Sequence, residues 1–225
     1  WAGRWRPVGV VAAARVRHHR GLRRGRGCLG RSARRFGTHM TRPRGWLGAL
    51  LVSLAHLAAD LLVAIRDPAI TKIMSSVTGL GSATAAAVIV GLLYLADFHE
   101  EVATSVLALG LTGPVVLTLM GLVQRPFPPN PVCVTSGEMV AHSFPSGHAA
   151  GVTVFALLAV RSDRLPLAPT AVLAVLIAVS RMYLGTHYLS DTFVGIAIGA
   201  AAFFIVTRWM VASQQRLTHV IKNYH

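Results

Sequence analysis

Long apolar stretches separated by short polar segments fill the sequence from residue 46 onward. Most of them approach the roughly 20 residues that a helix needs to cross the hydrocarbon core of a bilayer. None alternates apolar and polar residues with the period of two that is typical of a β-strand. We therefore predict an all-α protein, a bundle of six transmembrane helices over residues 46–65, 82–97, 102–124, 147–160, 165–184 and 189–211.

The distribution of Arg and Lys along the loops predicts the orientation of this bundle. Basic residues are more frequent in the segments that lie inside when the N-terminus is cytoplasmic, and this remains true when residues 1–39 are left out. Loops of membrane proteins that are rich in Arg and Lys stay in the cytoplasm. We therefore predict that the N- and C-termini are cytoplasmic and that the loops 125–146 and 181–190 share the extracytoplasmic face.

The composition agrees with a polytopic membrane protein. Hydrophobic residues make up 53% of the 225 residues, charged residues only 13%, and the mean hydropathy is +0.56. These values exclude a disordered tail, a collagen-like fibre and a disulfide scaffold. The net charge of +14 comes mostly from residues 1–39, which hold 11 of the 22 basic residues and no acidic one. We divide the chain into this Arg-rich extension and a membrane domain over residues 40–225.

The Arg-rich extension, residues 1–39, shows no sustained apolar pattern, so we predict that it is disordered. Arg-rich runs bind RNA phosphates, and Arg-rich, acid-poor segments also act as targeting peptides. We favour a third interpretation, that the chain begins upstream of its natural start, because it opens with Trp1 and Met40 precedes a basic stretch and an apolar run. We expect no nucleic-acid partner, and no disulfide between Cys28 and Cys133, which lie on opposite sides of the predicted membrane.

Three polar clusters lie at the predicted extracytoplasmic face. Arg125 ends the third span, residues 143–148 (Ser-Phe-Pro-Ser-Gly-His) open the fourth, and residues 180–191 join the fifth to the sixth. Polar residues within membrane segments are costly, and they usually mark a functional site. Because the three clusters share one face, we expect their side chains to form a single site.

The first chemistry that these clusters suggest is phosphate binding. Ser146 and Gly147 open a helix, where unbonded N–H groups and the helix dipole attract anions. Two arginines, Arg125 and Arg181, can each bind phosphate oxygens through two parallel N–H groups. The pattern therefore predicts a site for a phosphate group.

The second chemistry is nucleophilic catalysis. His187 and Asp191 are four residues apart, so on a helix they share a face, and the carboxylate can hold one nitrogen of the imidazole ring. The other nitrogen is then free to act as a base or nucleophile. His148 is placed to give a proton to a leaving group. Together these residues indicate phosphoryl transfer without a metal or another cofactor.

At these residues the sequence resembles the type 2 phosphatidic acid phosphatase family of integral membrane lipid phosphatases. The family pattern is Lys-x6-Arg-Pro, then Pro-Ser-Gly-His, then Ser-Arg-x5-His-x3-Asp. The second and third motifs are complete, whereas the first has Thr118 at the lysine position. The matching residues are Arg125 and Pro126, then Pro145 to His148, then Ser180, Arg181, His187 and Asp191.

The resemblance implies a two-step reaction. His187 attacks phosphorus and forms a phosphohistidine, while Asp191 orients it. His148 protonates the leaving group and then activates water. The phosphate is held by residues of all three motifs, namely Arg125, Arg181, Ser146, Gly147 and, with a single hydroxyl in place of a lysine, Thr118.

The resemblance also implies the substrate class and the location. The expected substrate is an isoprenyl diphosphate, phosphatidic acid or phosphatidylglycerol phosphate, held in the bilayer of the plasma membrane with its tail between the helices. Two alternatives stay open. In the first, the protein is a lipid phosphotransferase with the same site, in which an acceptor hydroxyl replaces water. In the second, the protein is an inactive relative that keeps the motifs but lost catalysis together with the motif lysine.

Overall fold

The computed structural model describes residues 46–128, 131–132 and 142–223; the predictions for residues 1–39, Cys28 and Cys133 fall outside this part of the chain. The described residues form seven α-helices and no strand, so the all-α class is confirmed. The helices are α1 (Trp46–Ala64), α2 (Pro68–Gly79), α3 (Ala83–Leu95), α4 (His99–Val123), α5 (Gly147–Arg161), α6 (Leu167–Tyr183) and α7 (Leu189–Asn223).

Helix α2 is missing from the sequence prediction, which passes directly from the first span to residues 82–97. Lys72, Ser75 and Ser76 interrupt its apolar residues, and at 12 residues it is too short to read as a span. Its start is nevertheless encoded locally: the carboxylate of Asp67 accepts hydrogen bonds from the amides of Ala69 and Ile70. The helices α2 and α3 meet at a bend of 53°.

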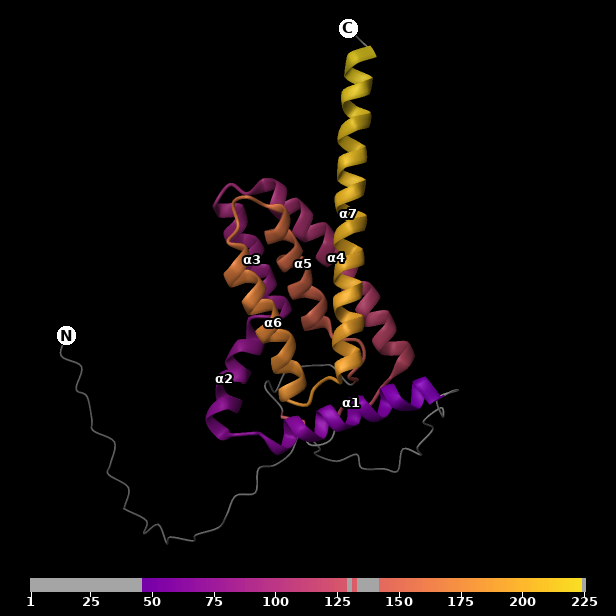
Figure 1. Cartoon of the computed structure of the whole chain (residues 1–225). Helices are drawn as coiled ribbons and strands as arrows, with labels where there is room; N and C mark the ends of the chain where they lie inside the picture. Colours follow the sequence, from indigo (N-terminus) through magenta and orange to yellow (C-terminus); the bar gives the residue numbers. More distant parts are fainter. Residues whose placement is uncertain (1–45, 129–130, 133–141, 224–225) are drawn as a thin grey trace, which may run out of the picture.

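The centre of the bundle is α5, which packs against α4, α6 and α7 (Figure 1). Two glycines of α7 allow a close approach to α5, because a Cβ atom at Gly195 would overlap the carbonyl oxygen of Ser146 and one at Gly199 that of Ala150. Small residues with this four-residue spacing bring membrane helices together. Farther along, the core consists of side chains from four helices, namely Leu93, Ala108, Val154, Leu158, Phe203 and Val206.

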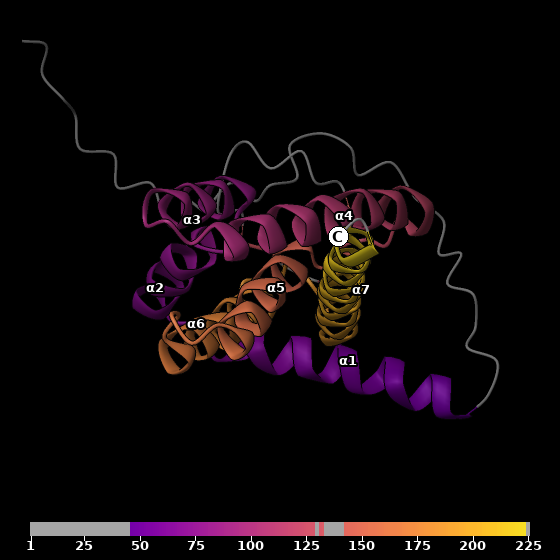
Figure 2. The ribbon, with the colours of Figure 1, turned by 90° about the horizontal axis from the view of Figure 1, so that it is seen from above.

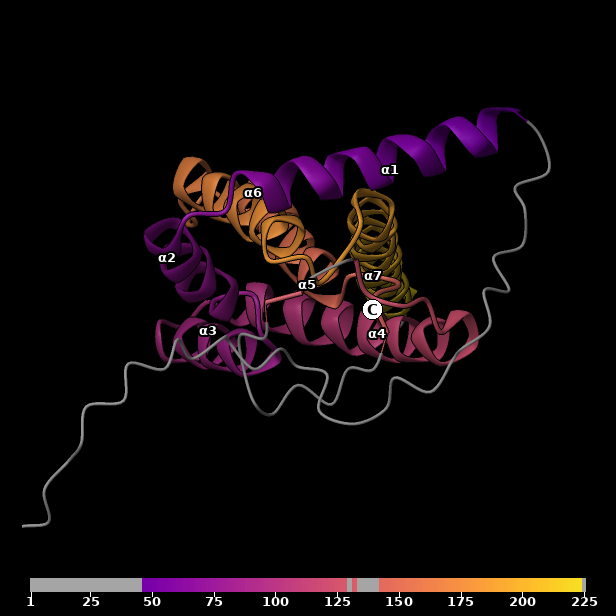
Figure 3. The same ribbon diagram turned by 90° about the horizontal axis from the view of Figure 1, so that it is seen from below.

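Helix α1 lies across one end of the bundle, although the sequence prediction makes it the first span. In the views along α7, that helix is seen end-on while α1 is seen at full length (Figures 2 and 3). The far end of α7 projects from the opposite end of the bundle (Figure 1). The cytoplasmic position of both termini stays a prediction.

Fewer of the described helices have the length and hydropathy of a full membrane span than the sequence predicts. Among the described residues, α4 and α7 are long and apolar enough to cross a bilayer, and the bent pair α2–α3 adds a third span if it is counted as one. With 15 and 17 residues, α5 and α6 are shorter than the usual span of about 20. The prediction of six spans is therefore not confirmed.

Candidate active site

The three predicted clusters lie together at the end of the bundle that α1 crosses, where α4 and α6 end and α5 and α7 begin (Figure 1). Backbone hydrogen bonds tie them to one another. The amide of Ser143 donates to the carbonyl of Arg125 over 2.8 Å, and the amide of Ser146 donates to the carbonyl of Asp191 over 3.0 Å. Segments up to 66 residues apart in the chain are thus held as one unit.

His187 lies in the loop between α6 and α7, with only 3% of its surface exposed. Its Nδ1 atom is hydrogen-bonded to the carbonyl oxygen of Ser143. Because a carbonyl only accepts, Nδ1 carries the proton and Nε2 keeps its lone pair. Nε2 lies 3.4 Å from Nη2 of Arg181. The tautomer is the one that a nucleophilic Nε2 requires.

The environment of His187 also keeps its ring neutral. The pKa of His187 is lowered from 6.5 to about 3, mostly by burial and also by the charge of Arg181, whereas the Ser143 carbonyl acts in the opposite direction. A buried imidazole next to a guanidinium loses more by gaining a charge than an exposed one. At neutral pH the ring is therefore uncharged, and the lone pair on Nε2 accepts from Nη2 of Arg181.

Asp191 is completely buried, but it does not hold His187 as the sequence predicts. Its Oδ1 accepts from Nη1 of Arg125 over 2.6 Å, and its Oδ2 accepts from the amide of Tyr188 over 2.9 Å. The helical spacing argument fails because α7 begins at Leu189, so that His187 precedes the helix. The carbonyl of Ser143 binds Nδ1 of His187 in place of the predicted carboxylate. The sequence analysis groups Ser143 with the site but assigns it no role.

The two predicted phosphate-binding arginines have different surroundings. Arg181, in the last turn of α6, is 2% exposed and lines a cavity. Arg125 follows the end of α4, pairs with Asp191, and stacks over the ring of Tyr188 with its Cζ atom 4.0 Å from the ring centroid. Arg125 thus stands at the same end of the bundle, beside the cavity lining rather than in it.

The start of α5 has the structure that the sequence predicts, with Ser146 and Gly147 at the beginning of the helix. The buried Oγ of Ser146 accepts from the amide of Ala149 and caps the helix. Gly147 and His148 follow in the first turn and line the same cavity as Arg181 and His187. A helix N-terminus, a guanidinium and two imidazoles therefore face one space.

Thr118, the predicted substitute for the motif lysine, is not brought to this space. It lies on an exposed side of α4, and the cavity is lined by its neighbours Val116, Leu117 and Met120 instead. Thr118 precedes Arg125 by seven positions, but α4 ends at Val123 with Gln124 in a left-handed conformation. Because the helix ends before Arg125, a spacing of two helical turns no longer puts positions 118 and 125 on the same face.

The cavity has a volume of about 680 Å³ and is apolar over most of its length. Its polar end holds His148, Arg181 and His187. From there it continues as a groove between α3 and α4, whose walls are largely small or aliphatic, including Ala83, Ala86, Ala87, Val90, Val106, Leu109, Gly113, Val116 and Leu117. The shape suits a molecule with a charged head and a long hydrocarbon tail.

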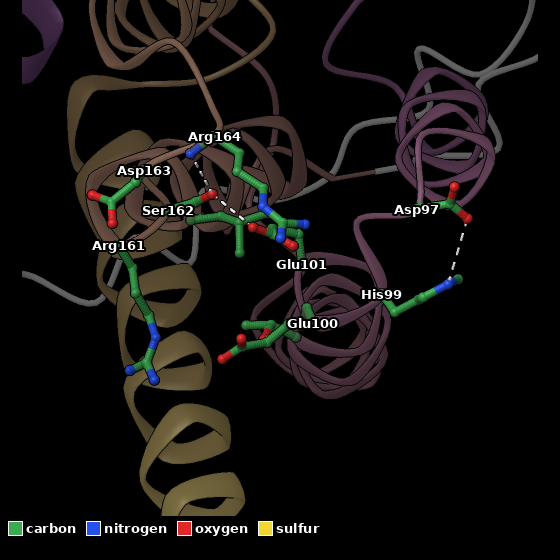
Figure 4. A pocket seen from close by; sticks show the side chains of 10 residues that line it. Asp97, His99, Glu100, Glu101, Arg161, Ser162, Asp163 and Arg164 are labelled. Atoms are coloured by element: carbon green, nitrogen blue, oxygen red, sulfur yellow. Dashed lines mark hydrogen bonds and ion pairs between the residues drawn. The ribbon is translucent and has the colours of Figure 1, made fainter.

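A second pocket, of about 410 Å³, lies at the opposite end of the bundle, where the turns before α4 and after α5 meet (Figure 4). Its carboxylates outnumber its arginines, and its contacts include a 2.7 Å hydrogen bond from Ser162 to Glu101 and an ion pair between His99 and Asp97. The carboxylates would repel a phosphate group. The cavity at the α1 end is therefore the candidate active site.

Comparisons with known proteins agree with this choice. The PAP2 superfamily matches residues 101–215, which include His148, Arg181 and His187. Among curated proteins, the decaprenylphosphoryl-5-phosphoribose phosphatase of Mycobacterium tuberculosis is 40% identical over 93 residues, which is 41% of this chain and 51% of that protein. The chain thus spans about half the length of the curated relatives it matches.

Two solved structures share the fold. The transmembrane PAP2 type phosphatidylglycerolphosphate phosphatase of Bacillus subtilis superimposes with a TM-score of 0.62 at 24% identity, covering 72% of this chain and 87% of that one. LpxE of Aquifex aeolicus superimposes with a TM-score of 0.55 at 26% identity, covering 70% and 94%.

Proposed function

Because the chain belongs to the PAP2 superfamily, we propose that it is an integral membrane phosphatase that hydrolyses a lipid phosphate or diphosphate through a phosphohistidine intermediate. One observation carries the proposal: His148, Arg181 and His187 face one cavity whose other walls are largely apolar. The polar end fits a phosphate group, and the groove between α3 and α4 fits a lipid tail.

In the first step, Nε2 of His187 attacks phosphorus and the bond from phosphorus to the leaving oxygen breaks. The negative charge of a bound phosphate favours the protonated ring of His148, which gives its proton to that oxygen, so the lipid leaves as an alcohol or a monophosphate. Arg181 and the amides at the start of α5 stabilise the charge on the equatorial oxygens. Such preorganised electrostatic stabilisation is usually the largest contribution to catalysis.

In the second step, water attacks the phosphohistidine. His148, now neutral, takes a proton from the water as its oxygen bonds to phosphorus, and the bond between phosphorus and Nε2 breaks. Phosphate leaves, and both histidines return to their starting states. The Ser143 carbonyl holds Nδ1 of His187 in both steps, and no step requires a metal ion.

Arg125 and Asp191 support the phosphate site as a pair. The carboxylate fixes one guanidinium nitrogen of Arg125 at 2.6 Å and also accepts from the amide of Tyr188, next to His187. In this role Arg125 contributes positive charge beside the cavity, and Asp191 holds both Arg125 and the loop that carries the nucleophile. Thr118 has no place in the proposed mechanism.

The proposed substrates are isoprenyl diphosphates, phosphatidic acid and phosphatidylglycerol phosphate, in the plasma membrane. The relative from Mycobacterium tuberculosis is named for a substrate that joins a polyprenyl chain to a phosphoribose, which supports a polyprenyl-linked substrate. We place the site on the extracytoplasmic face and the C-terminus in the cytoplasm, because Arg161, Arg164, Arg208 and Arg216 all lie towards the opposite end of the bundle.

The test uses the full chain purified in detergent, with EDTA present. Wild-type protein should release phosphate from a short-chain prenyl diphosphate or from phosphatidic acid, and His187→Ala should lower the rate by roughly 10³-fold or more, as loss of a nucleophile does. The control is His99→Ala, which removes an exposed histidine from the opposite end.

Three outcomes would contradict the proposal. The first is full activity in His187→Ala, and the second is loss of wild-type activity through chelation alone. The third is transfer of the phosphoryl group to an added alcohol in place of phosphate release, which would instead identify a lipid phosphotransferase.

A further inference from the structure

The bend between α2 and α3 forms one wall of the active site, although none of its residues belongs to the three motifs. The bend runs Thr78-Gly-Leu-Gly-Ser82, and Gly81 and Ser82 line the cavity. A Cβ atom on Gly81 would lie 3.1 Å from Cδ2 of His148 and 2.6 Å from a methyl group of Ile177. The backbone at Gly81 therefore packs directly against the ring of His148.

Behind this wall, Thr78 holds Arg181. Nη1 of Arg181 donates a hydrogen bond of 3.3 Å to Oγ1 of Thr78, while Nη2 of the same guanidinium lies 3.4 Å from Nε2 of His187. Thr78 is only 2% exposed and is not among the residues that line the cavity. Its hydroxyl therefore reaches a bound phosphate only through the arginine.

We propose that Thr78 is a positioning residue that orients the Arg181 guanidinium towards the phosphoryl group at His187. An arginine binds phosphate well only when its planar group presents the right edge to the oxygens. The long side chain does not determine that orientation by itself, whereas a buried acceptor for one terminal nitrogen does. This inference rests on the proposed function for the identity of the ligand, a phosphate group.

The experiment measures the affinity of the detergent-purified full chain for tungstate, a phosphate analogue that needs no turnover and no lipid. Thr78→Val keeps the shape of the side chain but removes the acceptor, so the dissociation constant should rise roughly tenfold, the effect of losing one hydrogen bond to a charged group. Thr78→Ser keeps the hydroxyl and should bind within about twofold of wild type.

The matched control is Ser76→Ala, on the same helix. The Ser76 hydroxyl donates to the carbonyl of Lys72 in its own helix, so its loss should leave the affinity for tungstate unchanged. A second comparison, made in an Arg181→Lys protein, distinguishes the positioning of Arg181 from a general effect on folding. In Arg181→Lys the charge remains but the nitrogen that reaches Thr78 is gone, and there Thr78→Val should cause no further loss.

Two results would overturn the inference. One is a Thr78→Val protein that binds tungstate as tightly as wild type; the other is a loss of affinity from Thr78→Val that is equally large in the Arg181→Lys protein. Should Thr78→Val fail to fold, Thr78→Ala and Thr78→Ser give the same comparison. A wild type that binds no tungstate would overturn both the inference and the phosphate site. A wild type that binds tungstate in a Thr78-dependent way but hydrolyses no lipid phosphate would leave the inference standing and contradict the proposed function alone.

Discussion

At the scale of single residues, the site depends on what each side chain is bonded to rather than on its spacing in the sequence. His187 has Nδ1 bound by a backbone carbonyl and Nε2 facing the cavity, while Asp191, four residues later, binds Arg125. The same residue types at the same spacing would act as a catalytic dyad if both lay on one helix. Here the helix begins between them, and each residue takes a different partner.

Burial of His187 predicts a specific dependence of stability on pH. The folded pKa of about 3 lies below the unfolded value of 6.5, so the unfolded chain binds more protons between these values. The contribution of His187 to stability is therefore complete above pH 6.5 and decreases as the pH falls. From pH 7 to pH 5, the free energy of unfolding of the wild type should fall by about 2 kcal/mol more than that of His187→Asn.

Chemical unfolding in detergent at the two pH values measures this difference. His148 and the other titrating groups are present in both proteins, so the comparison isolates His187. Parallel loss of stability in the two proteins would show that His187 is protonated in the folded state at pH 5, contrary to its burial beside Arg181.

Thr118 gives a second prediction at this scale. Restoring the motif lysine with Thr118→Lys should change kcat/KM by no more than about twofold, because the side chain points away from the cavity and substitutions at such sites have small effects. The measurement is phosphate release from the best substrate of the wild type. A gain of tenfold or more would mean that position 118 reaches the phosphate after all.

At the scale of helices, the site depends on how closely α5 and α7 approach. The start of α5 supplies Ser146, Gly147 and His148, and the start of α7 follows the loop that carries His187. Gly195 and Gly199 bring the two helices together, with the backbone of α5 in the space that a side chain would need. Packing between these helices therefore also sets the spacing between the two histidines.

The prediction at this scale concerns Gly199→Ala. Its added methyl group would overlap the carbonyl oxygen of Ala150, so the variant should be destabilised by about 1–3 kcal/mol, the usual cost of overpacking. The control is Gly110→Ala on α4, where no atom lies within 4 Å of the added carbon. Thermal unfolding in detergent should show a lower Tm for Gly199→Ala only; equal values for the two variants would contradict the close packing.

At the scale of the whole molecule, the cavity combines a charged end with an apolar groove, as the proposed reaction of a membrane lipid with water requires. Its charged end opens where α4, α5, α6 and α7 meet, and its apolar groove follows α3 and α4 along the bundle. Outward-facing side chains of the two helices, among them Val88, Leu92 and Leu122, are exposed and apolar. In the proposed function, a lipid enters the groove sideways from the bilayer while its phosphate stays at the polar end.

A bulky side chain in the groove should block long lipids selectively. Ala86→Phe should lower kcat/KM for a long-chain lipid phosphate at least tenfold, because each methylene kept out of an apolar site costs about 0.8 kcal/mol. Hydrolysis of a small water-soluble phosphate monoester should stay close to wild type. Val88→Phe, on the outer face of α3, is the control. An equal loss on both substrates would place the tail elsewhere.

The sequence by itself determined most of the helices and the residues at the polar end of the cavity. The predicted spans 82–97 and 147–160 correspond to Ala83–Leu95 and Gly147–Arg161, since apolar runs and capping residues are local signals. The histidines and Arg181 also came from the sequence, because their motifs are short and each lies at the end of a helix.

Only the tertiary structure decided how these parts meet. Thr78 bonds to Arg181 across 103 residues, Ser143 holds His187 across 44, and α1 lies across the bundle although its sequence reads as a span. Thr118 matches a motif position but faces away from the cavity. Such relations depend on where helices begin, bend and pack, and the free energy that sets them comes from contacts between distant segments, which no local pattern contains.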